Sequence, residues 1–157
     1  MPETDHQSYM ITFPRDDDIE QIVDIIRPLA QKRILGNIPQ LRSVIQELAV
    51  TGLPRQHWYD GPGQMPREII RQHASQQPCG DVAWVFYGTQ YGDRTAIESQ
   101  LAIIKEAFGQ IEGSKLRLPS DLPSDHYLHS RVQVCSRVPV RLLFLSTPLI
   151  DPYADVH

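Results

Sequence analysis

The chain has 157 residues, of which 41% are hydrophobic and 22% charged, and its formal net charge at pH 7 is −4. A globular domain of about this length buries roughly 68–70% of the surface of its unfolded chain, so one domain with a real core is expected. The acidic balance and the lack of a dense Lys and Arg patch argue against a nucleic-acid partner and against an anionic membrane surface.

Targeting signals and cysteines indicate the compartment. The start, "MPETDHQSYM", has no basic region followed by an apolar run, so no secretory signal is expected. Arg141 and two prolines interrupt the longest apolar stretch, residues 138–150, which is shorter than the roughly 20 residues of a spanning helix. Cys79 and Cys135 show no paired spacing, which favours two free thiols. We therefore expect a soluble intracellular protein with no membrane partner, cytoplasmic and peroxisomal locations not being distinguished.

The first predicted elements are a strand and a helix. Strand formers at Tyr9–Phe13 predict a short strand that ends at Pro14. Asp17 and Glu20 resemble a capping box for the helix that follows. Its apolar stripe recurs at spacings of three and four, at Ile19, Ile22, Val23, Ile26 and Leu29. Pro28 is expected to kink or end this helix.

A second helix is predicted to begin after Asn37, with Asn37 as its cap and Pro39 in its first turn. Its apolar residues are Leu41, Val44, Ile45 and Leu48. Gly52 is predicted to end it as a left-handed cap. Residues 53–64 contain Asp-Gly and Gly-Pro-Gly and predict an exposed excursion, after which Pro66 opens a short third helix.

The apolar run at residues 82–87 predicts a central strand covered on both faces. We expect Tyr87 to end this strand, and Gly88 and Gly92 to let the chain turn into a helix capped by Asp93. The apolar face of that helix comprises Ile97, Leu101, Ile104, Phe108 and Ile111. Because "YGTQYGDR" matches neither a dinucleotide fingerprint nor a phosphate loop, the glycines are interpreted as structural.

The last predicted elements complete an α+β arrangement. Gly109 and Gly113 mark the end of the helix, and the alternation at residues 115–118 predicts a short strand before Pro119. The two strands that flank this helix are expected to be parallel neighbours joined by a right-handed crossover. Helices packed on one face of a sheet are predicted.

Few residues suggest self-contained chemistry. His126 and His129, next to Asp125, could share a helical face suited to a metal, but no third ligand lies at a telling distance. Two solvated histidines are the alternative. No Ser-His-Asp arrangement or GxSxG motif is present, so a hydrolase is not predicted.

Two arginines are candidates for a binding role. Arg42 lies at the margin of the apolar face of the second predicted helix, and Arg131 lies within "HSRVQVCS" on a predicted short helix. Each could extend its apolar stem along the surface and keep its charge in water. Each could instead direct its guanidinium at an anionic cofactor or a carboxylate.

Five segments of the chain form an ordered series: "ITFPRDDDIEQIVDIIRPL", "NIPQLRSVIQELAVTG", "WVFYGTQYGD", "IKEAFGQIEGSKLRLPSD" and "SRVQVCSRVP". In this order they resemble the flavoproteins that oxidise para-substituted phenols, the vanillyl-alcohol oxidase and 4-cresol dehydrogenase group. The resemblance runs from about Tyr9 to Pro139 and corresponds to only the first part of the family's cap domain. It implies a ferredoxin-like cap-domain fragment with a mainly antiparallel sheet and helices packed on one face.

The resemblance also implies how the chain is divided. It predicts a flexible start (1–8), a partial FAD-linked oxidase cap domain (9–136) and a divergent tail (137–157), because Arg137 stands where relatives have glycine. We expect this departure to reflect truncation, altered splicing or a frame error. In relatives, the FAD-binding domain precedes this part, and the catalytic Tyr-Arg pair and the residue that carries the flavin follow it.

The implied function is oxidation of 4-hydroxybenzylic alcohols or 4-alkylphenols by hydride transfer to FAD, with a phenolic small molecule as substrate. Arg42 and Arg131 match arginines on the flavin and substrate side of the cap, where their positive field would favour a phenolate or the anionic reduced flavin. No catalytic residue or metal ligand is predicted in this chain, and the isolated chain is expected to bind no FAD and to be inactive. The alternative is a free-standing α+β binding or oligomerisation module. The sequence does not decide, for either function, whether the chain forms a homo-oligomer.

Overall fold

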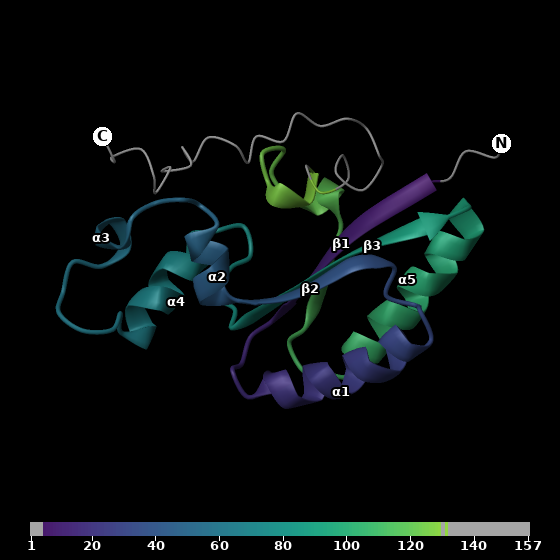
Figure 1. Cartoon of the computed structure of the whole chain (residues 1–157), viewed down its shortest axis with the longest axis horizontal. Coiled ribbons are helices and arrows are strands. Elements are labelled where there is room, and N and C mark those ends of the chain that lie inside the picture. Colours follow the sequence, from purple (N-terminus) through teal and green to yellow (C-terminus); the bar gives the residue numbers. More distant parts are fainter. Residues whose placement is uncertain (1–4, 130, 132–157) are drawn as a thin grey trace, which may run out of the picture.

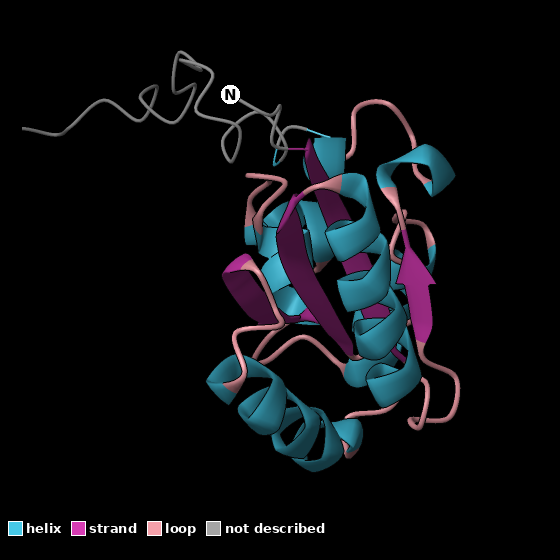
Figure 2. Ribbon diagram, turned by 90° about the vertical axis from the view of Figure 1, so that its right-hand side faces the viewer, coloured by secondary structure: helices cyan, strands magenta, loops and turns pink. Residues whose placement is uncertain are grey.

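The computed structural model describes residues 5–129 and Arg131, and within them four strands form one antiparallel sheet in the order β2-β3-β1-β4 (Figure 1). The elements are β1 (Asp5–Phe13), α1 (Asp18–Gln31), β2 (Asn37–Ser43), α2 (Val44–Ala49), α3 (Arg55–Trp58), α4 (Arg67–Ser75), β3 (Trp84–Gly92), α5 (Arg94–Phe108) and β4 (Lys115–Arg117). This strand order, with α1 and α5 on the same face (Figure 2), confirms the predicted ferredoxin-like α+β class. The predicted tail and Cys135 lie outside the described residues.

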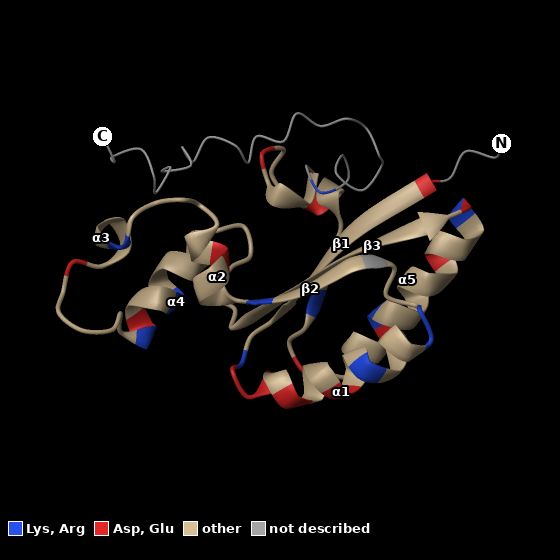
Figure 3. Cartoon of the chain, viewed as in Figure 1, with Lys and Arg blue, Asp and Glu red and all other residues tan. Residues whose placement is uncertain are grey.

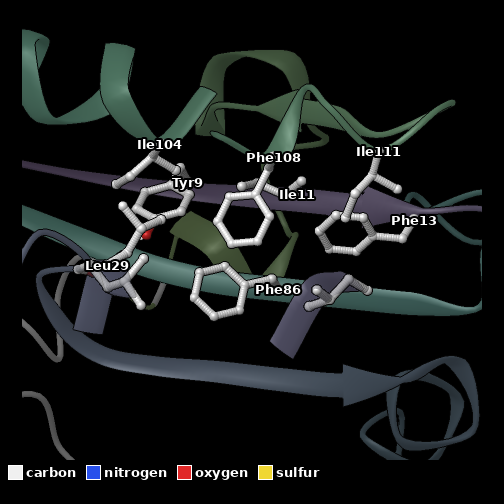
Figure 4. Close-up of a cluster of buried hydrophobic side chains, with 10 residues drawn as sticks. Tyr9, Ile11, Phe13, Leu29, Phe86, Ile104, Phe108 and Ile111 are labelled. Atoms are coloured by element: carbon white, nitrogen blue, oxygen red, sulfur yellow. Dashed lines mark hydrogen bonds between the residues drawn. The ribbon is translucent and has the colours of Figure 1, made fainter. Parts of the chain in front are cut away.

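The main core fills the space between the sheet and the helices α1 and α5. Alternate residues of β1, namely Tyr9, Ile11 and Phe13, point to this side and are at most 1% exposed. They meet Ile104 and Phe108 of α5, as Figure 4 shows. This packing confirms the predicted apolar face of α5, which needed a sheet to cover it.

The opposite face of the sheet is more polar. Met10 and Tyr87 pack there against Leu122 and Leu128, from the segment after β4. Other residues on this face are polar and yet buried, at Ser8, Thr12 and Thr89. The Ser8 and Thr89 hydroxyls hydrogen-bond across the strands at 2.9 Å, so their polar atoms are satisfied. The sheet therefore has one apolar face and one mixed face, and the candidate site lies over the second.

The first helix differs from its prediction at both ends. Asp17 is the N-cap, but its side chain makes no capping hydrogen bond, so the predicted capping box is wrong. Asp18 instead accepts from the backbone N–H of Arg15 at 3.1 Å. Pro28 does not end the helix, which continues to Gln31, because a proline in the last turn removes only one backbone hydrogen bond.

The helix predicted from Asn37 is wrong in its first half, which forms the edge strand β2. Pro39 is tolerated there because an edge strand leaves some of its N–H groups unpaired. The register shifts between Asn37 and Gln40, and Ile38 has a left-handed φ of +48°. The helix α2 begins only at Val44, where Ser43 and Gln46 form a capping box. Arg42 is consequently on a strand rather than on a helix.

The two glycines of "YGTQYGD" do not form the predicted turn after Tyr87. The strand β3 continues to Gly92, and Gly88 lies in its middle opposite Tyr9. A side chain at Gly88 would collide with the ring of Tyr9, so the glycine is required by packing. Asp93 caps α5 as predicted, accepting from the Ala96 N–H at 2.8 Å.

The strands on either side of α5 are not neighbours, contrary to the prediction. Both β3 and β4 pair with β1, which lies between them, and both run antiparallel to it. They are therefore parallel to each other but separated by one strand. Pro66 precedes α4 and a short strand follows Gly113, as predicted. The first strand is longer than predicted, because β1 begins at Asp5, so residues 5–8 of the predicted flexible start pair with β3. Among the helices described, none is both long and apolar enough to cross a membrane.

Candidate functional site

A cluster of polar side chains lies over the mixed face of the sheet, which we call the arginine cluster. Figure 3 shows that charged residues are few along the strands. The members of the arginine cluster are Gln40 and Arg42 from β2, Glu47 from α2, Tyr87 from β3, and Tyr127 and Arg131 from the segment after β4. Arg42 and Arg131, the two arginines predicted from the sequence, are thus brought together by elements almost 90 residues apart.

Gln40 joins the two arginines. Its side-chain oxygen accepts from Arg42 Nη2 at 2.9 Å and from Arg131 Nη1 at 3.2 Å. The hydroxyl of Tyr127 is 3.5 Å from the same oxygen. The alternation of β2 places Gln40 and Arg42 on the same face, because they are two residues apart on a strand.

Arg131 is buried, with only 3% of its surface exposed. Besides Gln40, its guanidinium donates to the Thr89 hydroxyl at 3.2 Å, to the Tyr127 hydroxyl at 3.3 Å and to the carbonyl of Ile38. All of these acceptors are neutral, and no carboxylate within residues 5–129 forms an ion pair with Arg131. Because a buried charge is costly without a counter-charge, this guanidinium favours an anion close to it.

Arg42 has a different environment. It forms an ion pair with Glu47 at 3.4 Å, and its side chain is 17% exposed. Its guanidinium lies over the rings of Tyr87 and Tyr127, at 5.3 and 4.8 Å from their centroids. Both contacts stabilise a cation held against aromatic faces. The predicted alternative of a snorkelling side chain is therefore wrong for Arg42, whose charged end lies within the cluster.

Glu47 also accepts a hydrogen bond from the Tyr87 hydroxyl at 2.8 Å. Burial, and then the neighbouring Glu47 carboxylate, raise the pKa of the Tyr87 phenol well above its usual range. Tyr87 is therefore a neutral donor at physiological pH. Within the described part of the cluster, two guanidinium charges face one carboxylate, which leaves one net positive charge.

A pocket of about 470 Å³ lies beside the cluster, and Glu47 and Tyr127 line both. Cys79 also lines it, and burial raises the pKa of that thiol to about 11, so it is not ionised at neutral pH. His126 lines it too. Burial, followed by the charge of His129, lowers the pKa of the His126 imidazole. Among the described residues that line the pocket, neither the Cys79 thiol nor the His126 imidazole is therefore charged at neutral pH.

The histidine pair does not form a metal site in the described chain. His126 Nδ1 accepts from the Leu128 N–H at 3.1 Å, and a ring nitrogen of His129 lies 3.5 Å from the Leu122 carbonyl. Within residues 5–129 and Arg131, no group of three or more His, Cys, Asp or Glu side chains could hold a metal ion.

The sequence reasoning missed the neutral members of the cluster. Gln40 and Tyr87 are ordinary residue types, and nothing in their spacing relates them to an arginine far along the chain. Tyr127 and Arg131 are four residues apart, which places them on one side of a helical segment. This spacing was the one sequence signal that could have linked Tyr127 to Arg131.

No protein-family model matches the chain. Its similarity is to one part of the enzymes that oxidise 4-alkylphenols, which include a flavoprotein. This confirms, for a partial chain, the predicted resemblance to the vanillyl-alcohol oxidase and 4-cresol dehydrogenase group.

Three relatives carry this finding. The flavoprotein subunit of 4-cresol dehydrogenase (hydroxylating) from Pseudomonas putida is 25% identical over 131 residues, which are 83% of this chain and 25% of the relative. A 4-ethylphenol oxidase from Gulosibacter chungangensis, solved with isoeugenol, is 28% identical with a TM-score of 0.75, covering 89% of this chain and 27% of the oxidase. A p-cresol methylhydroxylase solved with substrate bound has the same fold, with a TM-score of 0.73 and 22% identity over 82% of this chain and 25% of that chain. The chain spans about a quarter of the length of the curated relative.

Proposed function

We propose that this chain is part of a FAD-dependent oxidoreductase that oxidises 4-hydroxybenzylic alcohols or 4-alkylphenols by hydride transfer to the flavin. The similarity to two enzymes of 4-alkylphenols supports the proposal. The observation that carries it furthest is the buried Arg131 guanidinium, which has only neutral partners among residues 5–129 and lies next to Arg42. A site that holds an uncompensated positive charge suits a reaction in which negative charge is present or develops.

When bound, FAD would supply the hydride acceptor, and the residues of this chain would set the electrostatics around it. Arg42 and Arg131 face the flavin and substrate side and favour the phenolate form of the substrate or the anionic reduced flavin. Their role in this proposal is electrostatic rather than proton transfer. Tyr87 stays neutral and holds Glu47, which in turn orients Arg42.

The donor set of the cluster fits an anionic group, since guanidinium groups present N–H donors in a planar fork. It provides no glycine-rich cradle for a pyrophosphate. We therefore propose that the dinucleotide part of FAD is bound elsewhere in the longer protein, and that the isolated chain neither retains FAD nor oxidises phenols.

Purified chain incubated with FAD and then desalted tests this part of the proposal. We expect no flavin absorbance in the protein fraction and no oxidation of 4-ethylphenol or 4-hydroxybenzyl alcohol. Flavin absorbance that stays with the chain at a stoichiometric ratio would contradict it. The 4-cresol dehydrogenase flavoprotein subunit, treated identically, is the positive control.

The free-standing module is the rival function, and an exposed apolar surface argues against it. Ile45, Val50 and Leu53 are 59%, 57% and 45% exposed, and two of them line an apolar groove of about 590 Å³ with Trp58 and Met65. A longer protein would cover such a surface. Gel filtration over a range of concentrations distinguishes the two: the proposal expects the folded chain to self-associate as its concentration rises, whereas a chain that stays monomeric at every concentration would favour the module.

A further inference from the structure

We propose that Gln40 is a positioning residue that holds Arg42 and Arg131 together as a binding site for one oxyanion. The proposal rests on the proposed function for its choice of ligand, an oxyanion carried by a phenolic molecule, and it deepens that function by naming how the cationic site is built. The side-chain oxygen of Gln40 is the shared acceptor of both guanidinium groups, at 2.9 and 3.2 Å.

The neutrality of Gln40 determines the charge of the site. Two guanidinium groups that contact the same atom repel each other, and an amide oxygen satisfies their N–H groups without cancelling either charge. A glutamate of the same length would accept the same hydrogen bonds and neutralise one of them. Because Glu47 already pairs with Arg42, the charge left over within the described chain belongs mainly to Arg131.

The backbone of β2 is distorted in a way that completes the site. Ile38 has a φ of +48°, a strained conformation that a β-branched residue rarely adopts. Its carbonyl accepts from Arg131 Nη2. Ile38 lies within the register shift between Asn37 and Gln40, and regular pairing of β2 with β3 resumes at Gln40, a member of the cluster. Strain at the point of contact supports a site held in one geometry.

Access to the site is through Arg42 and Tyr127. The Arg42 side chain is 17% exposed, and Tyr127 lines the adjacent pocket of about 470 Å³. We therefore propose that an oxyanion approaches the guanidinium pair from the Tyr127 side, past the carboxylates of Glu47 and Asp125 that line the same pocket. Guanidinium groups bind carboxylates with paired N–H donors, which makes a carboxylate a suitable probe.

The test compares binding of 4-hydroxybenzoate and 4-hydroxybenzamide to the full chain by isothermal titration and thermal shift. The two probes differ in one charge, so we expect the acid to bind and to raise the melting temperature, and the amide to bind at least about tenfold more weakly. Inorganic phosphate is a third probe. Binding of phosphate without binding of 4-hydroxybenzoate would support the oxyanion site and contradict the phenolic ligand, which separates this inference from the proposed function.

Variants at Gln40 give the second readout. We expect Gln40→Glu to melt higher than the parent chain without any probe and to lose at least about tenfold in affinity for 4-hydroxybenzoate, because the new carboxylate occupies the role of the anion. If Gln40 had a purely structural role, its replacement by glutamate would not raise the melting temperature and weaken the binding of 4-hydroxybenzoate together. Gln72→Glu, at an exposed position on α4, adds the same charge and should change neither. A Gln40→Glu chain that melts lower, or that binds the acid unchanged, would overturn the proposal.

The chain has carboxylates outside the described residues, at Glu3, Asp151, Asp155 and its C-terminus. The triple variant Glu3→Gln/Asp151→Asn/Asp155→Asn tests whether these side chains supply the anion. We expect its melting temperature and its affinity for 4-hydroxybenzoate to match those of the parent chain. A lower melting temperature together with tighter binding of the acid would show that the chain provides its own anion and would refute an external ligand.

Discussion

The ring of Tyr9 lies over Gly88, its direct partner on the neighbouring strand. A Cβ atom at Gly88 would be 2.3 Å from the Tyr9 hydroxyl oxygen and 2.4 Å from Cζ, closer than any real contact. Both residues are buried in the centre of the sheet, and the Tyr9 hydroxyl donates to the Leu35 carbonyl at 3.3 Å. This glycine therefore makes room for an aromatic side chain on the helix-covered face.

Gly88→Ala should accordingly destabilise the fold. We expect the free energy of unfolding to fall by about 1–3 kcal/mol, because the added methyl group forces the Tyr9 ring or the strand to move. Urea denaturation measures the change. Tyr9→Val in the same chain removes the ring, so Gly88→Ala should cost much less in that background. Equal costs in the two backgrounds would contradict the steric account.

Sequence reasoning identified Gly88 as structural but assigned it the wrong role. A glycine after an apolar run is typical of a turn. Only the pairing of β1 with β3 shows that the ring of Tyr9 occupies the space where a side chain of residue 88 would lie. The helix α5 was predictable because its apolar period and its Asp93 cap are local. The strand β2 was not, since its pairing with β3 is non-local and its residues also fit a helical period.

Glu47 should contribute to stability through two partners. Glu47→Ala removes the ion pair with Arg42 and the acceptor of the Tyr87 hydroxyl, and we expect a loss of about 1.5–3 kcal/mol in the free energy of unfolding. Glu47→Gln keeps the acceptor and should lose less. Urea denaturation at constant protein concentration compares them.

The control for Glu47 is Glu98→Gln on α5. Glu98 pairs with Arg94 at 3.2 Å, but both side chains are mostly exposed, at 68% and 83%. Such a surface pair contributes little, so the midpoint of unfolding should stay nearly unchanged. If both Glu47 variants also unfolded at the parent midpoint, the buried network around Arg42 would not stabilise the fold.

His126 should make stability depend on pH. Its pKa is lowered in the folded chain by burial and by His129, so the unfolded chain binds more protons as the pH falls below the ordinary value of 6.5. The free energy of unfolding should therefore be retained above that pH and decrease below it. The hydrogen bond from the Leu128 N–H to Nδ1 has the same consequence, since it requires an unprotonated nitrogen.

Denaturation of the parent chain and of His126→Asn at about pH 7 and about pH 5.5 checks this expectation. Asparagine can accept the same hydrogen bond but does not titrate, so the variant should lose less stability between the two conditions. An identical loss in both chains would show that other groups determine the pH dependence.

The candidate site was predictable only in part, for a physical reason. Arg42 and Arg131 could be singled out because a guanidinium suits an anionic partner and because both match arginines of the family that the sequence resembles. Their meeting at Gln40 depends on the edge strand β2 and on the return of the chain after β4 across the mixed face of the sheet. Neither residue spacing nor composition encodes such a contact between distant segments.

The central claim is that this chain is a working part of a flavoprotein for 4-alkylphenols. A chimera of the 4-cresol dehydrogenase flavoprotein subunit, with its matching segment replaced by residues 9–131 of this chain, tests it by absorbance spectroscopy under anaerobic conditions. We predict that the chimera retains its flavin and that 4-cresol bleaches the flavin absorbance. A folded, monodisperse chimera that retains no flavin, or whose flavin 4-cresol leaves oxidised, would contradict the claim.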